Sequence, residues 1–378
     1  MRAGLSLALP AALLAAVVGF LLVAQPLREL TGAAPPVEEL SVEATRLTPG
    51  LISLTLRADG SAPVALAQVQ VDGAWREFAL APDAPIGRLA TARLDIPYPW
   101  IGGETHHLAL VTGTGAAFDY TIEVAQATPG FAPRSLATLT LVGLLLGLAP
   151  VAIGLMAYPA LRRAGPAARR FVLALTVGLL VYLLIDTLHE GIELGAAALG
   201  RLRGETLVWV AALATAAAQL GVGRRGGAAP RGLALAGFMA LGIGLHNLGE
   251  GLVVGGALAT GAAALASYLV VGFVLHNVTE GLGIATPLTA VRPPFAVFAG
   301  LALLAGTPAV AGVWLGSQAV SPFLAAVCFG VGAGAILQVV IEVSAYLVRE
   351  SGGRAIGGAT ASGFALGLSA MYATALLV

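Results

Sequence analysis

Long apolar runs, separated by short polar segments, dominate the last two thirds of the chain. From Leu136 onward each run is long enough to cross a bilayer as a helix, which takes about 20 apolar residues. Pro, Gly and Arg gather in the breaks, as expected of short loops. The pattern predicts eight spans, at 136–158, 171–198, 205–222, 232–258, 263–287, 295–316, 322–348 and 357–378. Residues 136–378 are therefore predicted to form an all-α polytopic membrane bundle of eight helices.

A different pattern occupies residues 37–128. Apolar and polar positions alternate with period two in runs such as "LISLTLRADG" and "VALAQVQVDG", and an Asp-Gly pair ends each of these two. Such alternation is typical of half-buried strands. Several short strands at regular spacing favour a small all-β, sandwich-like domain, and about 90 residues are enough to bury one core.

A further apolar run, from Leu5 to Ala24, follows Arg2. Its length suits a membrane anchor, whereas Leu22-Val23-Ala24 also resembles the cleavage site of a secretory signal. Residues 1–30 are therefore interpreted as an N-terminal anchor or signal segment. Both alternatives predict that the β domain is exported.

The arginines predict the orientation of the spans. With the β domain outside, ten arginines fall in inside loops and only Arg201 and Arg203 in outside loops. The ten are Arg162, Arg163, Arg169, Arg170, Arg224, Arg225, Arg231, Arg292, Arg349 and Arg354. This bias follows the positive-inside rule. It predicts a multi-pass protein of a bacterial inner membrane, with the β domain on the periplasmic side.

Composition narrows the class of protein further. Hydrophobic residues make up 58% of the chain and charged residues only 11%, against roughly a quarter charged in soluble domains. Lipid is therefore the expected solvent, and a net charge of zero gives no basis for binding nucleic acid. The single cysteine, Cys328, excludes a disulfide framework and cysteine-based metal sites.

Ionisable side chains inside a membrane span are costly and usually mark function. Here such side chains, with three neighbouring amides, concentrate in four spans: Asp186, His189, Glu190 and Glu193 in span two; His246, Asn247 and Glu250 in span four; His276, Asn277 and Glu280 in span five; Gln338 and Glu342 in span seven.

Spans four and five repeat one motif, "LHNLGEGL" from Leu245 and "LHNVTEGL" from Leu275. The His-to-Glu spacing of four places both side chains on one helical face, and the neighbouring glycines let the two helices approach. Two imidazoles and two carboxylates would form a four-ligand site for Zn²⁺, Fe²⁺ or Mn²⁺. The predicted ligands are His246, Glu250, His276 and Glu280. The alternative is an interhelical hydrogen bond, which a second copy of the motif makes less attractive.

The remaining polar residues suggest a path to this site. Asp186, His189 and Glu193 recur at helical spacing, with Glu190 bordering the same face. They are interpreted as an ion path or proton relay, the alternative being acids that simply reach the interface. "HEGIE" lacks the second His of a metalloprotease motif.

Span seven carries a second polar pair, Gln338 and Glu342, which also share a face. The lone acid needs either a partner or a water-lined path, and the path is preferred. In the β domain, His106 and His107 point to opposite faces of a strand and are read as ordinary strand residues.

Together these motifs resemble the ZIP family of metal transporters, which has eight spans and carries its metal site on the fourth and fifth. The fourth-span motif His-Asn-x-x-(Asp/Glu)-Gly reads His246-Asn247-Leu248-Gly249-Glu250-Gly251. The resemblance covers about residues 136–378 and implies inward transport of a divalent metal, zinc foremost, by a homodimer.

The chain also departs from the family pattern. The fifth-span Pro is Thr279, Asn277 replaces an acidic ligand, and span six carries no acid for a second metal. One metal site is therefore expected, with Asn247 and Asn277 as further candidates beside it.

The expected function is ion transport, not enzyme catalysis. Metal ions and the lipid bilayer are the expected partners, and spans two, four, five and seven would form the route. Two alternatives stay open. A membrane metalloenzyme would need a substrate-sized cleft beside the metal, and a metal sensor would bind the ion without moving it.

Overall fold

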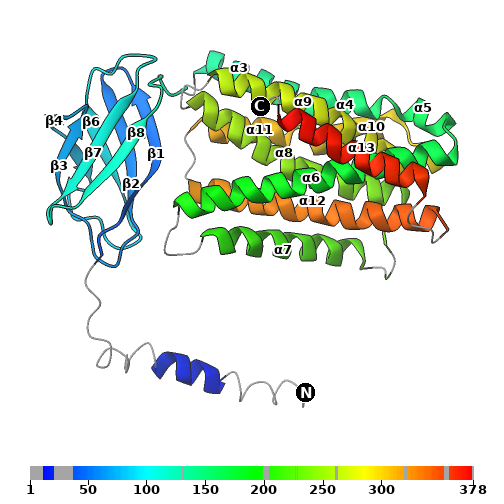
Figure 1. The fold of residues 1–378 in the computed structure, drawn as a ribbon, viewed down its shortest axis with the longest axis horizontal. Helices are drawn as coiled ribbons and strands as arrows, with labels where there is room; N and C mark the ends of the chain where they lie inside the picture. Colours follow the sequence, from blue (N-terminus) through cyan, green and yellow to red (C-terminus); the bar gives the residue numbers. More distant parts are fainter. Residues whose placement is uncertain are drawn as a thin grey trace.

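The computed structural model comprises a β domain and a helical bundle, with the β domain against one end of the bundle (Figure 1). The residues that it describes are 12–20, 37–129, 132–198, 204–225, 227, 229–259, 263–318, 322–352 and 357–376. Of the predicted N-terminal anchor, residues 12–20 are helical, and the rest of that prediction lies outside the described residues.

The β domain consists of two four-stranded sheets, and every strand pair in them is antiparallel. One sheet, in spatial order, contains β1 (Leu40–Thr48), β2 (Leu51–Ala58), β6 (Thr91–Pro97) and β5 (Ala79–Ala81). The other contains β4 (Ala74–Arg76), β3 (Leu66–Val71), β7 (His106–Thr112) and β8 (Ala117–Ile122). The predicted small antiparallel β domain is confirmed.

Alternation along the strands creates the core of this domain. Ile52, Leu54 and Leu56 on β2 are fully buried, and so is Val69 on β3 in the other sheet. The intervening residues of β2 stay partly exposed, because successive side chains on a strand point to opposite faces. Asp72 follows β3 in a left-handed conformation (φ 53°), as the tight turn of a two-residue hairpin requires.

The bundle is built from α3 (Pro133–Gly143), the π-helix η1 (Leu144–Leu148), α4 (Ala149–Leu155), α5 (Tyr158–Arg163), α6 (Pro166–Ala198), α7 (Gly204–Gly223), α8 (Gly232–Ala259), α9 (Ala263–Ala285), the 3₁₀-helix η2 (Thr286–Ala290), α10 (Phe295–Gly306), α11 (Pro308–Gly316), α12 (Pro322–Glu350) and α13 (Gly358–Ala375). Within the described residues, seven helical stretches are long and apolar enough to cross a membrane. These helices indicate a multi-pass membrane protein.

The eighth predicted span forms α13, which is not among those seven. It is rich in Gly, Ala, Ser and Thr and packs closely on α6. A Cβ added to Gly363 would lie 2.3 Å from the Phe171 carbonyl oxygen, and one added to Gly367 would lie 2.2 Å from that of Leu175. A transmembrane count of eight therefore remains a prediction, although all eight predicted spans contain helix.

Spans one and six are interrupted at prolines, Pro150 and Pro308. Proline lacks the N–H that a helix needs and clashes with the carbonyl four residues earlier. Before Pro150 the helix widens into the π-helical turn η1, and α10 ends at Gly306 just before Pro308. The Leu146 carbonyl thereby loses its usual donor, the N–H of residue 150.

The β domain contacts the near ends of α11 and α12. The Arg57 guanidinium lies 5.9 Å from the centre of the Phe323 ring. The Gln318 side-chain amide donates a hydrogen bond to the Pro129 carbonyl oxygen, at 3.2 Å. Arg57 also pairs with Glu43 on the neighbouring strand. The sheet that contains β1 and β2 therefore faces the bundle (Figure 1).

Candidate metal centre

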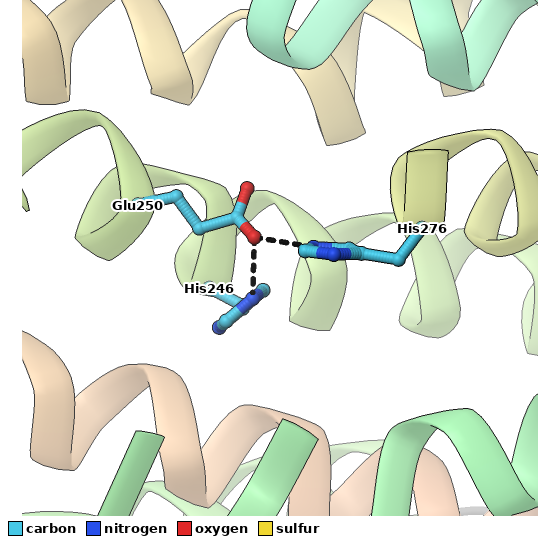
Figure 2. A group of neighbouring side chains, drawn as sticks. All are labelled: His246, Glu250 and His276. Atoms are coloured by element: carbon cyan, nitrogen blue, oxygen red, sulfur yellow. Dashed lines mark hydrogen bonds and ion pairs between the residues drawn. The ribbon is translucent and has the colours of Figure 1, made fainter. Parts of the chain in front are cut away.

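Three side chains from the two repeats meet inside the bundle (Figure 2). His246 and Glu250 lie one turn apart on α8, and His276 reaches them from α9. Glu250 Oε1 accepts hydrogen bonds from His246 Nε2, at 3.1 Å, and from His276 Nε2, at 2.5 Å. All three residues are at most 6% exposed. The corresponding histidines of the two repeats thus both hydrogen-bond to one carboxylate, that of Glu250.

This arrangement has the dimensions of a metal site. One ligand atom from each of the three residues lies within 4.8 Å of the others. Bonds of about 2.0–2.1 Å in a tetrahedral zinc site set ligand atoms roughly 3.3 Å apart. Small side-chain movements would therefore admit an ion, which would take the place of the protons now shared between the imidazoles and the carboxylate. Imidazole nitrogen with carboxylate oxygen suits borderline divalent ions.

Glu280, the fourth predicted ligand, stands apart from this group. It follows His276 by one turn on α9 and is 3% exposed. Neither of its carboxylate oxygens has a hydrogen-bond partner among the described residues. The structure therefore gathers three of the four predicted ligands. A buried carboxyl without a partner is costly, so an ion that drew Glu280 in would relieve that cost.

The two asparagines of the repeat bind main-chain carbonyls. Asn247 Nδ2 donates to the Ala305 carbonyl, at 2.9 Å, and Asn277 Nδ2 donates to the Leu146 carbonyl, at 3.0 Å. Asn277 Nδ2 also donates to Glu250 Oε2, at 3.0 Å. Both asparagines were candidate ligands. Their amide nitrogens instead support interrupted helices, and their Oδ1 atoms, both buried, have no partner in the described part of the chain.

Glycines make these contacts geometrically feasible. A Cβ on Gly251 would lie 2.3 Å from the Ala309 carbonyl oxygen, and one on Gly281 would lie 2.2 Å from that of Val151. Gly251 and Gly281 occupy the same place in the two repeats. Each motif helix therefore packs, backbone to backbone, against a helix that begins at a proline break. This close approach brings each asparagine within reach of a carbonyl.

A cavity of about 170 Å³ adjoins the centre. His246, Glu250 and His276 line it, together with Asp186 and Glu190 from α6. Asp186 and Glu190 lie one turn apart on the same face of α6. Two further acidic side chains therefore border the space from which an ion would reach the three ligands.

The other polar residues of span two do not share this space. The His189 side chain is 70% exposed, and its Nε2 pairs with Glu193 Oε1, at 3.2 Å. Of the four predicted path residues, Asp186 and Glu190 line the cavity, whereas His189 and Glu193 pair with each other outside it. The apolar residues of span two do not fix its rotation closely enough to separate these two faces.

Glu342 has a partner that the sequence did not suggest. Arg224 Nε donates to Glu342 Oε1, at 2.8 Å. The glutamate side chain is 1% exposed and that of the arginine 45%. Glu342 and Gln338 do not line the cavity beside the histidines, and both amide atoms of Gln338 lack partners in the described residues. Glu342 therefore has a partner, the alternative to the preferred water-lined path, because Arg224, interpreted as a loop arginine, supplies its countercharge.

Two residues near the centre carry no signal in the sequence. Thr187 Oγ1 lies 3.4 Å from His246 Nδ1, and the Phe273 ring meets the His276 ring edge-on, with centroids 5.6 Å apart. A threonine and a phenylalanine in apolar spans look like ordinary packing residues. Only their position beside the two imidazoles gives them a role in orienting the rings.

A third buried histidine, His106, belongs to the β domain. His106 Nδ1 lies 2.8 Å from Asp72 Oδ2, which also accepts a hydrogen bond from the Tyr98 hydroxyl, at 2.9 Å. His107 turns to Thr121, at 3.2 Å. Burial raises the pKa of Asp72, but hydrogen bonds from the His107 N–H, His106 and Tyr98 outweigh it, so the pKa is below its ordinary value. These are contacts of strand residues, as predicted.

A scan against protein-family models finds no match for this sequence, and a search of curated proteins finds none either. What the protein does must therefore be inferred from the chemistry of the buried centre.

Proposed function

We propose that this protein is a membrane transporter of divalent metal ions, with His246, Glu250 and His276 as its central binding site. One observation carries the proposal. Two imidazoles and a carboxylate, all buried, converge inside a bundle of apolar helices. Ionisable groups at such depth are rare unless they serve an ion or a proton. Glu280 completes the coordination when an ion is bound.

The likeness of the two repeats to the ZIP motif supports zinc as the first substrate to test, with iron and manganese next. The ligand set contains no thiolate, so affinity stays moderate and the ion can leave again, as conduction requires. In this proposal the chain is a ZIP-like transporter in a bacterial inner membrane, acts as a homodimer, and carries its β domain on the periplasmic side.

The cavity favours an ion over an organic substrate. Its volume is about 170 Å³, whereas pockets for small organic molecules usually measure about 300–1,000 Å³. A metalloenzyme would need room for its substrate beside the metal. The narrow space next to the ligands therefore supports transport over catalysis.

The proposed route begins at the cavity. Asp186 and Glu190 attract the cation toward the centre, where the His/Glu ligands replace its water. Release follows at the end of the bundle that carries most of the loop arginines, so the direction is inward. The route combines α6, α8 and α9.

Metal flux into proteoliposomes tests the proposal. Zn²⁺, Fe²⁺ and Mn²⁺ would be supplied outside and their uptake followed for wild type, His246→Ala and Glu250→Gln. His189→Ala is the matched control, because this histidine also lies in a span but is exposed and outside the cavity. We expect both site variants to lose most of the flux and the control to keep it. Unchanged flux in well-folded Glu250→Gln protein would refute the proposal.

The sensor alternative has its own observation, the contact of the β domain with the bundle through Arg57 and Phe323. A sensor would bind zinc with the same ligands but show no flux in any vesicle. Flux and zinc binding measured on the same protein therefore separate the two functions, because a sensor binds zinc without flux and a transporter shows both.

A further inference from the structure

An apolar groove lies between α4–α5 and α10, at the end of the bundle opposite the β domain (Figure 1). Its volume is about 450 Å³, and its lining, which includes Leu155 and Ala299, is almost wholly apolar. Two large apolar residues of the lining are highly exposed, Met156 at 77% and Phe295 at 84%. In a membrane protein such a surface faces lipid, so the groove is open to acyl chains.

The groove has fixed walls. The Tyr158 hydroxyl donates to the Val291 carbonyl oxygen, at 2.6 Å. Its ring packs on Phe298 with centroids 4.9 Å apart. These contacts connect α5 to the segment that enters α10. The spacing between the two sides is therefore set within the protein, without a ligand.

Three arginines lie close in the chain to residues that line or border this groove. Arg162 follows Tyr158 by one helical turn, Arg163 is next to it, and Arg292 follows Val291, the residue to which Tyr158 bonds. No hydrogen bond or ion pair to any of the three occurs among the described residues. The three arginines also have no acidic residue near them in the sequence, because neither residues 124–185 nor residues 281–341 contain any Asp or Glu.

Two of the other arginines at this end have acidic partners. Arg169 lies 3.6 Å from Glu350, and Arg224 lies 2.8 Å from Glu342. The positive-inside rule accounts for arginine in these loops, but it does not require uncompensated arginines to cluster beside an apolar groove. That combination of charge and apolar surface matches the two ends of a lipid.

We propose that this groove binds an anionic glycerophospholipid, its acyl chain along Leu155 and Phe298 and its phosphate at Arg162, Arg163 and Arg292. Arginine matches phosphate with paired N–H donors, and basic pockets at the membrane surface select anionic headgroups. The groove runs along α4 and the start of α5, from Ala152 to Tyr158, about 9 Å at 1.5 Å per residue, which accommodates the first part of a chain. A second copy fits worse, because it would add its own arginines to the same interface.

Native mass spectrometry of the full chain in mild detergent tests this site. The probes are phosphatidylglycerol and phosphatidylcholine with identical chains. We expect phosphatidylglycerol to be retained at least tenfold better. Each arginine near the membrane surface raises the affinity for an anionic lipid on the order of fivefold. R162Q/R163Q/R292Q should therefore weaken the retention of phosphatidylglycerol by up to about a hundredfold. Arg225→Gln with Arg231→Gln, in the loop between α7 and α8, is the matched control and should bind like wild type.

A second variant tests the groove independently of charge. Ala299→Trp fills it while leaving the arginines intact, and should also lower phosphatidylglycerol retention, whereas millimolar inorganic phosphate should not displace the lipid. Zinc binding and thermal unfolding serve as checks of folding. Equal retention by the triple variant and wild type, an equal loss in the control pair, or displacement by phosphate would each overturn the proposal. The proposal would also be overturned if the wild-type protein were a dimer that Ala299→Trp dissociates while lipid retention stays unchanged.

Discussion

Asn247 and Asn277 hold the same place in the two repeats, and their comparison tests how the centre is supported. Asn247→Ala removes one hydrogen bond, to the Ala305 carbonyl. Asn277→Ala removes two, to the Leu146 carbonyl and to Glu250 Oε2. The two substitutions delete the same atoms from equally buried positions on neighbouring helices. Differences between them therefore report the bond to Glu250.

The number of hydrogen bonds that each substitution removes sets the expected loss of stability. Side-chain hydrogen bonds between membrane helices contribute about 0.6 kcal/mol on average and at most about 1.7 kcal/mol. Asn247→Ala should lower the free energy of unfolding by roughly that amount and Asn277→Ala by roughly twice as much. Loss of a group that orients a metal ligand typically weakens metal binding about 10–100-fold. Only Asn277→Ala should show this loss, because only Asn277 contacts a ligand.

Two assays check this prediction on the same detergent-purified proteins. Thermal unfolding without metal gives the relative stabilities, and titration calorimetry with Zn²⁺ gives the affinities. We expect Asn247→Ala to bind zinc within about threefold of wild type, well below the loss typical of a partner that contacts a ligand. Equal zinc affinities for the two variants would refute the assigned role of Asn277, whatever their stabilities.

Three further predictions concern other parts of the chain. Arg224→Gln leaves Glu342 buried without its countercharge, so unfolding should become about 3–5 kcal/mol easier, and adding Glu342→Gln should recover most of that loss in the same thermal assay. Gly251→Ala places a Cβ 2.3 Å from a main-chain oxygen of α11 and should lower folded yield, whereas Gly237→Ala, with nothing within 4 Å, should not. The pKa of Asp72 is lowered in the folded protein. Its stabilising effect is therefore complete above about pH 4 and is lost as pH falls below that, so Asp72→Asn should destabilise the β domain at pH 7 but much less near pH 2.

Local pattern was enough to predict the two structural classes in the chain. Alternation with period two specifies strands wherever one face is buried, and β2 buries alternate residues as its sequence indicates. Apolar runs of about 20 residues specify membrane helices, because lipid leaves no other way to satisfy the backbone. The His-to-Glu spacing of four is likewise a local property, and it alone places His246 and Glu250 on one helical face.

Which residues meet across helices was decided by the tertiary structure alone. Glu280 repeats the spacing of Glu250 but lies outside the three-residue group, because ligand convergence depends on the rotation and distance of α8 and α9. Asn277 reaches the Leu146 carbonyl, 131 positions away in the sequence, only because Pro150 breaks that helix and glycine lets the backbones touch. Arg224 likewise meets Glu342 across 118 positions. Sequence periodicity fixes the face that a side chain occupies on its own helix, whereas its partner on another helix is fixed by packing.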